Sequence, residues 1–124
     1  MGDWTAEELH KIGAADESEI AALRPDGSLR PSTTIWVVRV VDDLYVRSYR
    51  GRSGAWFRSV VRRPEGRIRA GGVTRDVAFQ EPDDADRAAI DQAYRTKYAH
   101  YARSYVDPMV SPNATAATLR LIPR

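Results

Sequence analysis

The chain has 124 residues, a formal net charge of +2 and no cysteine. This length suits one domain with a core of its own, and the missing cysteines exclude a disulfide framework, a thiolate zinc site and a cysteine nucleophile. No apolar run approaches the roughly 20 residues of a membrane span, and the acidic, amphipathic start does not resemble a signal peptide. We therefore expect one domain, residues 1–124, in a reducing compartment such as the cytoplasm.

Positive charge is concentrated between residues 47 and 75, where there are nine arginines and one acid, Glu65. This stretch carries 9 − 1 = +8, so the rest of the chain carries +2 − 8 = −6. A local cluster of this kind is a stronger indication of an anionic partner than the small global charge. Its arginines are residues 47, 50, 52, 58, 62, 63, 67, 69 and 75.

The first predicted element is a short helix over residues 5–13, because residues 5–8 (Thr-Ala-Glu-Glu) have the pattern of a capping box. A strand is expected over residues 18–24. The Pro-Asp-Gly-Ser sequence at residues 25–28 then predicts a turn, because proline presets φ and glycine accepts positive φ.

The next predicted strand covers residues 33–41, TTIWVVRVV. Its β-branched run has few polar interruptions, which is typical of a strand covered on both faces. Two aspartates turn the chain into a further strand at residues 44–48, and the two strands form a hairpin. Alternation in this strand places Tyr45 and Arg47 on one face and Leu44, Val46 and Ser48 on the other.

A helix is predicted over residues 53–63, with Ser53 as its N-cap and a proline after its end. A second hairpin follows, with strands at residues 67–70 and 73–80 joined by Gly71-Gly72, since this pair tolerates the positive φ of a two-residue turn. The apolar side of the helix consists of Trp56, Phe57, Val60 and Val61.

A long helix is predicted over residues 84–104, and a final strand over residues 117–122. The helix carries a tyrosine stripe, which we expect to pack against the sheet or a subunit partner, or else to form a wall over a flat cofactor; it consists of Tyr94, Tyr98, Tyr101 and Tyr105. About six strands in hairpins, with few helices, indicate a small antiparallel barrel of the α+β class.

The best candidate site is the loop and helix start at residues 48–58. Arg50 and Arg52 lie beside glycines there, so guanidinium groups and accessible backbone N–H groups can bind a phosphate or a carboxylate. A solvated arginine-rich turn is the alternative. Trp56 belongs either to the core or to a stacking surface for a planar ligand.

Other kinds of site have less support. His10 and His100 lack carboxylate partners at ligand spacing, so we expect no metal site. There is no GxSxG elbow for a nucleophilic serine. Arg67 and Arg69 share one strand face, which is either solvated or directed at a phosphate or a subunit partner. Nucleic-acid binding requires exposed aromatics among the basic residues, and the aromatics here look mostly buried.

The order of motifs over residues 35–72 carries a resemblance. A Trp-Val-Val-Arg-Val strand, an acidic turn, Leu-Tyr-Val-Arg-Ser, a Gly/Arg loop, Ala-Trp-Phe-Arg-Ser, Arg-Pro-Glu and a strand ending in Gly-Gly succeed one another. This succession resembles the deazaflavin-dependent nitroreductase branch of the flavin-binding split β-barrel superfamily, over residues 18–80 and the last strand. The whole chain is also similar to a family of small bacterial proteins of unknown function, which share its Trp-Thr start, Ile-Trp-Val-Val-Arg strand and Ala-Thr-Leu-Arg-Leu end.

The resemblance implies a six-stranded antiparallel split β-barrel with a short N-terminal helix, a crossover helix and a long C-terminal helix. It also implies a homodimer and a cofactor, flavin mononucleotide or a deazaflavin coenzyme. In the family, one loop holds the cofactor phosphates, and a strand start and a helix start lie against its ring system. The resemblance implies that the matching residues of this chain are cofactor-binding candidates: Arg30, Thr33, Thr34, Ser48, Arg50, Gly51, Arg52, Ser53, Ala55 and Trp56.

Three functions remain open at this point. The first is a flavin- or deazaflavin-dependent oxidoreductase, in which the cofactor supplies the hydride chemistry and the protein supplies binding. The second is a non-enzymatic small-ligand-binding protein or scaffold homodimer on the same barrel. The third is nucleic-acid binding, which we rank last because the arginines fit one pocket better than a long stripe.

Overall fold

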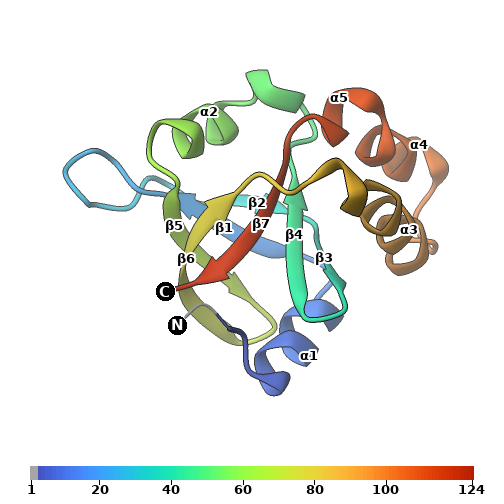
Figure 1. Cartoon of the computed structure of the whole chain (residues 1–124), viewed down its shortest axis with the longest axis horizontal. Coiled ribbons are helices and arrows are strands. Elements are labelled where there is room, and N and C mark those ends of the chain that lie inside the picture. Colours follow the sequence, from blue (N-terminus) through green and yellow to red (C-terminus); the bar gives the residue numbers. More distant parts are fainter. Residues whose placement is uncertain (1–2) are drawn as a thin grey trace.

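A computed structural model describes residues 3–124, in which seven antiparallel strands form one sheet in the order β2-β1-β5-β6-β7-β4-β3 (Figure 1). The strands are β1 (Ser18–Ala22), β2 (Thr33–Ile35), β3 (Val37–Val40), β4 (Asp43–Arg47), β5 (Glu65–Ala70), β6 (Val73–Gln80) and β7 (Thr118–Pro123). The α-helices are α1 (Ala6–Ala14), α2 (Ala55–Arg62), α3 (Arg87–Lys97), α4 (Arg103–Val106) and α5 (Pro112–Thr115). Short 3₁₀ turns cover Gly51–Ser53 (η1), Asp84–Asp86 (η2) and Asp107–Val110 (η3).

The sheet curls into a nearly closed barrel, since its two edge strands are consecutive in the chain. β2 pairs with β1 at one edge and β3 pairs with β4 at the other, and only Trp36 separates β2 from β3. The expected α+β antiparallel barrel is therefore confirmed. The expected count of six strands is wrong by one, because the run at residues 33–41 divides at Trp36, whose ring stacks on Tyr98 at 3.9 Å between centroids.

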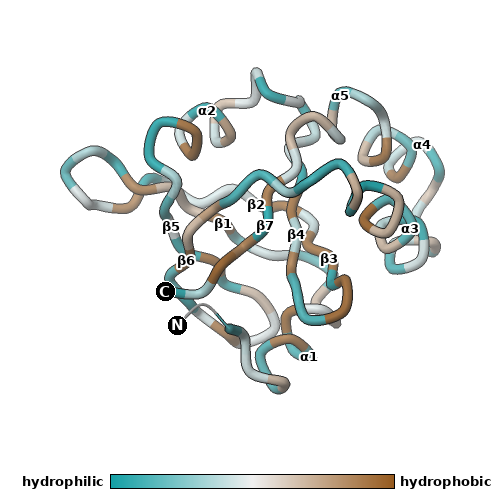
Figure 2. The backbone as a smooth tube through the Cα atoms, viewed as in Figure 1, coloured by the Kyte–Doolittle hydropathy of each residue, from teal (hydrophilic) through white to brown (hydrophobic). Residues whose placement is uncertain are grey.

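The barrel interior holds the main core. Buried side chains from the strands meet one face of α1 and one face of α2, and Figure 1 places these two helices at opposite ends of the barrel. Figure 2 shows apolar stretches along β3, β4 and β7, and hydrophilic stretches in the connection from β6 to α3. Fully buried members of this core include Ile12, Ile20, Val37, Leu44, Val46, Phe57, Val60, Ile68, Val77 and Leu121.

A second core lies between the outer face of β3 and β4 and the helix α3. Val38 and Tyr45 contribute from the strands, and Ile90, Tyr94 and Tyr98 from the α3 region. β4 is thus buried on both faces. The prediction that residues 33–41 form a strand covered on both faces holds only at Val37 and Val38, because Thr33, Thr34, Arg39 and Val41 are exposed. The prediction that the tyrosine stripe packs on the sheet holds for Tyr94 and Tyr98.

The predicted long helix at residues 84–104 is wrong. α3 ends at Lys97, the chain turns through residues 98–102, and α4 begins at Arg103. The hydroxyl of Tyr98 donates to the carbonyl of Asp16 at 2.9 Å and accepts from the amide of Val37 at 3.3 Å. These contacts and the stacking on Trp36 hold Tyr98 at the barrel seam, and such tertiary contacts override helix propensity.

Two local predictions agree with the structure. Thr5 and Glu8 form the capping box of α1. Gly71 and Gly72 both have positive φ, 58° and 83°, in the turn between β5 and β6, as a two-residue hairpin turn requires. No helix within residues 3–124 is long and apolar enough to cross a membrane.

Candidate functional site

A cleft of about 670 Å³ opens between the start of β2, the end of β4, the first turn of α2 and the α4–η3 segment. This volume lies within the range of roughly 300–1,000 Å³ that is typical of small-molecule sites. Its walls are formed by Thr33, Thr34, Ile35, Trp36, Arg47, Ser48, Tyr49, Arg50, Ser53, Gly54, Ala55, Trp56, Arg58, Tyr105 and Met109.

The floor of the cleft is a tight loop between β4 and α2. The amide of Gly51 donates to the carbonyl of Ser48 at 2.9 Å, and the amide of Gly54 donates to the carbonyl of Gly51 at 3.2 Å. Gly51 has a φ of 70°, and a Cβ there would overlap the side-chain amide of Asn113. A Cβ on Gly54 would lie 2.6 Å from the hydroxyl oxygen of Ser48. Both glycines are therefore needed for the close packing of this loop.

The N-terminus of α2 faces the cleft without a side-chain cap. The prediction of Ser53 as the N-cap is wrong by one residue. The N-cap is Gly54, and glycine has no side-chain oxygen that could accept a hydrogen bond from the helix amides. The hydroxyl of Ser53 instead donates to the carbonyl of Arg50 at 3.1 Å. The first amides of an α-helix lack intrahelical acceptors, so this uncapped end carries a partial positive charge beside the cleft.

Charge in the cleft is entirely cationic. Three of its lining residues are arginines and none is an acid. Arg50 and Arg58 are exposed, and neither forms an ion pair with a residue in the described part of the chain. The third, Arg47, is buried and paired. Two guanidinium groups are therefore free to bind an anion here.

Aromatic rings form much of the remaining wall. Trp36 is held flat against Tyr98, with an interplanar angle of 6°. Trp56 is half-buried, in an edge-on contact with Phe57. Tyr49 and Tyr105 are 61% and 63% exposed on the rim. The cleft thus combines ordered indole rings with cationic groups, a combination that suits a planar, anionic molecule.

Seven of the ten candidate residues line the cleft: Thr33, Thr34, Ser48, Arg50, Ser53, Ala55 and Trp56. Arg30, Gly51 and Arg52 do not line it. The guanidinium of Arg52 turns to Glu81, at 2.6 Å, and to the carbonyl of Ala116, at 2.9 Å. Gly51 belongs to the loop, where its positive φ allows the tight turn, but it does not line the cleft. Whether these ten residues bind a cofactor stays a prediction.

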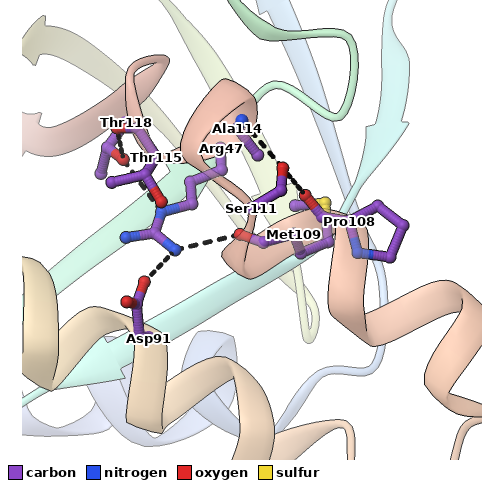
Figure 3. Close-up of polar contacts among 8 residues, drawn as sticks. All are labelled: Arg47, Asp91, Pro108, Met109, Ser111, Ala114, Thr115 and Thr118. Atoms are coloured by element: carbon purple, nitrogen blue, oxygen red, sulfur yellow. Dashed lines mark hydrogen bonds and ion pairs between the residues drawn. The ribbon is translucent and has the colours of Figure 1, made fainter.

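Arg58 ends the predicted candidate stretch, residues 48–58, but was not among the ten single candidates; the structure places Arg58 at the cleft and Arg52 outside it. Sequence reasoning missed the burial of Arg47, whose side chain is fully buried. Figure 3 shows Arg47 binding Asp91 of α3 at 2.5 Å and the carbonyl of Met109 at 3.0 Å, while its Nε donates to Thr118 at 2.9 Å. Alternation had placed Arg47 beside Tyr45 on the face that α3 covers. An acid at position 91 on the predicted helix was the available signal.

Burial also affects Tyr94, an ionisable group next to Arg47. Burial raises the pKa of Tyr94 well above its ordinary value, against the opposing effect of nearby Arg47. The guanidinium carbon of Arg47 lies 5.3 Å from the centre of the Tyr94 ring. Among the described residues, no group of three His, Cys, Asp or Glu side chains could hold a metal ion.

The family follows from a match over most of the chain. Residues 8–121 match the model of DUF2255, a family described as uncharacterized proteins conserved in bacteria. The chain belongs to this family. The expected membership of a bacterial family of unknown function is thereby confirmed. No curated protein matches the chain.

Several solved structures share the fold at low sequence identity. A conserved hypothetical protein from Mycobacterium tuberculosis has a TM-score of 0.72 at 13% identity, covering 98% of this chain and 81% of that chain. A FAD-binding protein from Mesorhizobium loti has a TM-score of 0.65 at 16% identity, covering 98% and 91%. An F420-H2-dependent reductase has a TM-score of 0.64 at 12% identity, covering 86% and 93%. At these identities the likeness establishes the barrel fold alone.

Proposed function

We propose that the chain binds flavin mononucleotide or a deazaflavin coenzyme in the cleft described above and acts as an oxidoreductase. The observation that carries this proposal is the pair Arg50 and Arg58, two exposed arginines without ion-pair partners in the described chain, beside the uncapped start of α2. Guanidinium forks and helix N-termini are the groups that proteins use to bind phosphate.

The residues present fit such a cofactor. Arg50, Arg58 and the first amides of α2 would hold the phosphate end. Trp56 and Trp36 would hold the ring system by stacking. The hydroxyl of Thr34 is less available, because it donates to Glu19 at 2.7 Å. When bound, the cofactor supplies hydride transfer, and the protein supplies binding, orientation and exclusion of water.

The lining residues support a cofactor-based reaction in a second way. The cleft contains no His, Asp, Glu, Lys or Cys side chain that could act as a general acid or base. Hydride transfer to or from a flavin needs little from protein acids and bases. The structural neighbours include a FAD-binding protein and an F420-H2-dependent reductase on the same fold, which supports this class of ligand.

The rim suggests how the cleft becomes covered. Tyr49 and Tyr105 are among the few large hydrophobic side chains that are exposed in the described chain, and both line the cleft. A second copy of the chain covering them would complete the site, consistent with the homodimer that the sequence resemblance implies. Sedimentation of the purified protein measures this: a monomer at micromolar concentration would contradict the arrangement.

The test of cofactor binding is thermal unfolding with flavin mononucleotide or a deazaflavin coenzyme. A ligand at 100 times its dissociation constant stabilises a protein by roughly 2.7 kcal/mol, so the midpoint should rise by several degrees. The double variant Arg50→Ala/Arg58→Ala should lose most of this shift. The matched control is Arg62→Ala/Arg69→Ala, which removes the same charge from two exposed arginines outside the cleft. No shift with either cofactor would overturn the proposal.

A second measurement separates an oxidoreductase from a binding protein. The reduced cofactor is bound anaerobically and mixed with quinone or nitroaromatic acceptors, and its reoxidation is followed by absorbance. Faster reoxidation than for the free cofactor supports the enzyme. Tight binding with no acceleration by any acceptor would leave the chain as a ligand-binding protein.

A further inference from the structure

One wall of the cleft is the α4–η3 segment, residues 103–110, which contributes Tyr105 and Met109 to the lining. α4 and η3 are four residues long each, and helices this short are not stable without tertiary contacts. Among the eight residues of this segment, Val106 and Met109 are buried and the others are partly or fully exposed. The position of this wall therefore depends on a small number of contacts.

Arg47 makes a buried polar contact with this wall. Its Nη1 donates to the carbonyl of Met109 at 3.0 Å and to the carboxylate of Asp91 at 2.5 Å, and its Nε donates to the hydroxyl of Thr118 at 2.9 Å. These partners are 62, 44 and 71 positions away in the sequence. One guanidinium group thus joins β4 to η3, α3 and β7, as Figure 3 shows. The side chain of Arg47 is fully buried, so water does not compete for these bonds.

The contact with Met109 depends on the ion pair with Asp91. A guanidinium group is a planar fork with fixed donor directions, and the same Nη1 serves both acceptors. Asp91 compensates a charge that would otherwise be buried alone, and it fixes the plane in which Nη1 points at the wall. Asp91 itself does not line the cleft. α3 therefore acts on the cleft wall through Arg47.

We propose that Arg47 is the positioning residue of the cleft: with Asp91, it fixes the backbone at Met109 and so holds the α4–η3 wall in its place beside the ligand. Arg47 acts through the wall and does not bind the ligand, because its side chain is buried and its charge is compensated. The identity of the ligand rests on the proposed function, whereas the fixing of the wall is measurable in the ligand-free chain.

The first measurement is amide hydrogen exchange of the ligand-free chain, in the parent and in Arg47→Met/Asp91→Leu. This double variant replaces the buried pair with apolar side chains, so it should keep most of the global stability while it lacks the bond to Met109. Amides of residues 103–110 should exchange about tenfold faster than in the parent, and those of β5 and β6 should not change. Ile68→Val, a buried substitution in the barrel core outside the cleft, is the control and should leave exchange in residues 103–110 unchanged.

The second measurement is a titration with flavin mononucleotide, followed by cofactor fluorescence. The double variant Arg47→Met/Asp91→Leu should bind about tenfold more weakly, although its stability is near that of the parent, because the wall is no longer held in place before binding. Ile68→Val should bind with the affinity of the parent, although it is less stable. A merely structural role of the ion pair would change affinity and stability together.

Asp91→Asn tests the same contact with a smaller change, and it decides if the double variant does not fold; it should give the same selective exchange in residues 103–110. Two results would overturn the proposal. One is exchange in this segment that stays at the rate of the parent, and the other is unchanged affinity in a variant of a parent that binds flavin mononucleotide. A parent that binds neither cofactor would refute the proposed function alone, and amide exchange would then decide the role of Arg47.

Discussion

Arginines at the cleft rim differ from two arginines of the β5–β6 hairpin, although the third hairpin arginine, Arg69, is also without an ion pair among the described residues. On the hairpin, Arg67 binds Asp76 across the strands at 2.8 Å, and Arg75 binds Glu8 of α1 at 2.7 Å. On the rim, Arg50 and Arg58 have no such partners among the described residues. In the sequence all five arginines belong to one cationic stretch. The comparison teaches that the position of the acids, which come from other segments, decides which arginines are free to bind a ligand.

The largest effect on stability is expected at the buried ion pair between Arg47 and Asp91. Arg47, the arginine of the stretch that is fully buried, holds Asp91 in a strong ion pair. Asp91→Ala leaves an uncompensated buried charge and should lower the free energy of unfolding by about 3 kcal/mol, measured by urea denaturation. The double variant Arg47→Met/Asp91→Leu removes both charges and should recover most of the loss. A loss below 1 kcal/mol in the single variant would show that solvent already compensates Arg47.

The next effect is expected in the loop that presents Arg50. Gly51→Ala places a side chain at a φ of 70° and against Asn113, and should cost about 2 kcal/mol. Gly72→Ala on the hairpin is the control: it has a φ of 83° but an open surrounding, so only the backbone cost of about 1 kcal/mol applies. The double variant Gly51→Ala/Asn113→Ala should lose about as much free energy of unfolding as Gly72→Ala. Equal losses in the single variants would mean that Asn113 moves aside freely.

Local sequence signals predicted much of the hairpin side and less of the cleft. The capping box and the Gly-Gly turn depend on neighbouring residues, and each was predicted correctly. The break at Trp36 and the end of α3 at Lys97 depend on Tyr98, which contacts residues about 60 and 80 positions away. Such contacts leave no mark in the local pattern of residues.

The candidate site shows the same division. The glycines and arginines at residues 50–54 indicated an anion-binding loop, and the structure places Arg50 at the cleft. The choice between Arg52 and Arg58 could not be made from the loop, because it depends on Glu81 and Ala116, which draw Arg52 away. The burial of Arg47 likewise depends on Asp91 arriving from α3.

Lys97 extends the comparison to a buried cation without a carboxylate in contact. Its ammonium group donates to the carbonyl of Val37 at 2.6 Å, and burial lowers its pKa to about 8. The folded chain thus binds fewer protons than the unfolded chain between pH 8 and about 10.5, so Lys97 makes stability rise with pH across this window. The side chain is partly exposed, which limits the effect to about 1 kcal/mol.

The measurement compares the parent with Lys97→Met by urea denaturation at pH 7.5 and pH 10. Other groups titrate equally in both proteins, so their effects cancel in the difference. The parent should gain about 1 kcal/mol relative to the variant between the two pH values. A constant difference would mean that Lys97 keeps its ordinary pKa in the folded chain.

The smallest effect is expected on the paired hairpin. Arg67 and Asp76 are both about half exposed, and ion pairs between exposed groups contribute roughly 0–1 kcal/mol. Exchanging them in Arg67→Asp/Asp76→Arg should therefore change the free energy of unfolding by less than about 0.5 kcal/mol, while either single substitution places like charges opposite each other and should cost slightly more. The exchange should also leave cofactor-induced stabilisation unchanged, unlike the removal of Arg50 and Arg58. If the exchange abolished that stabilisation, the ligand would bind the hairpin arginines rather than Arg50 and Arg58 at the cleft.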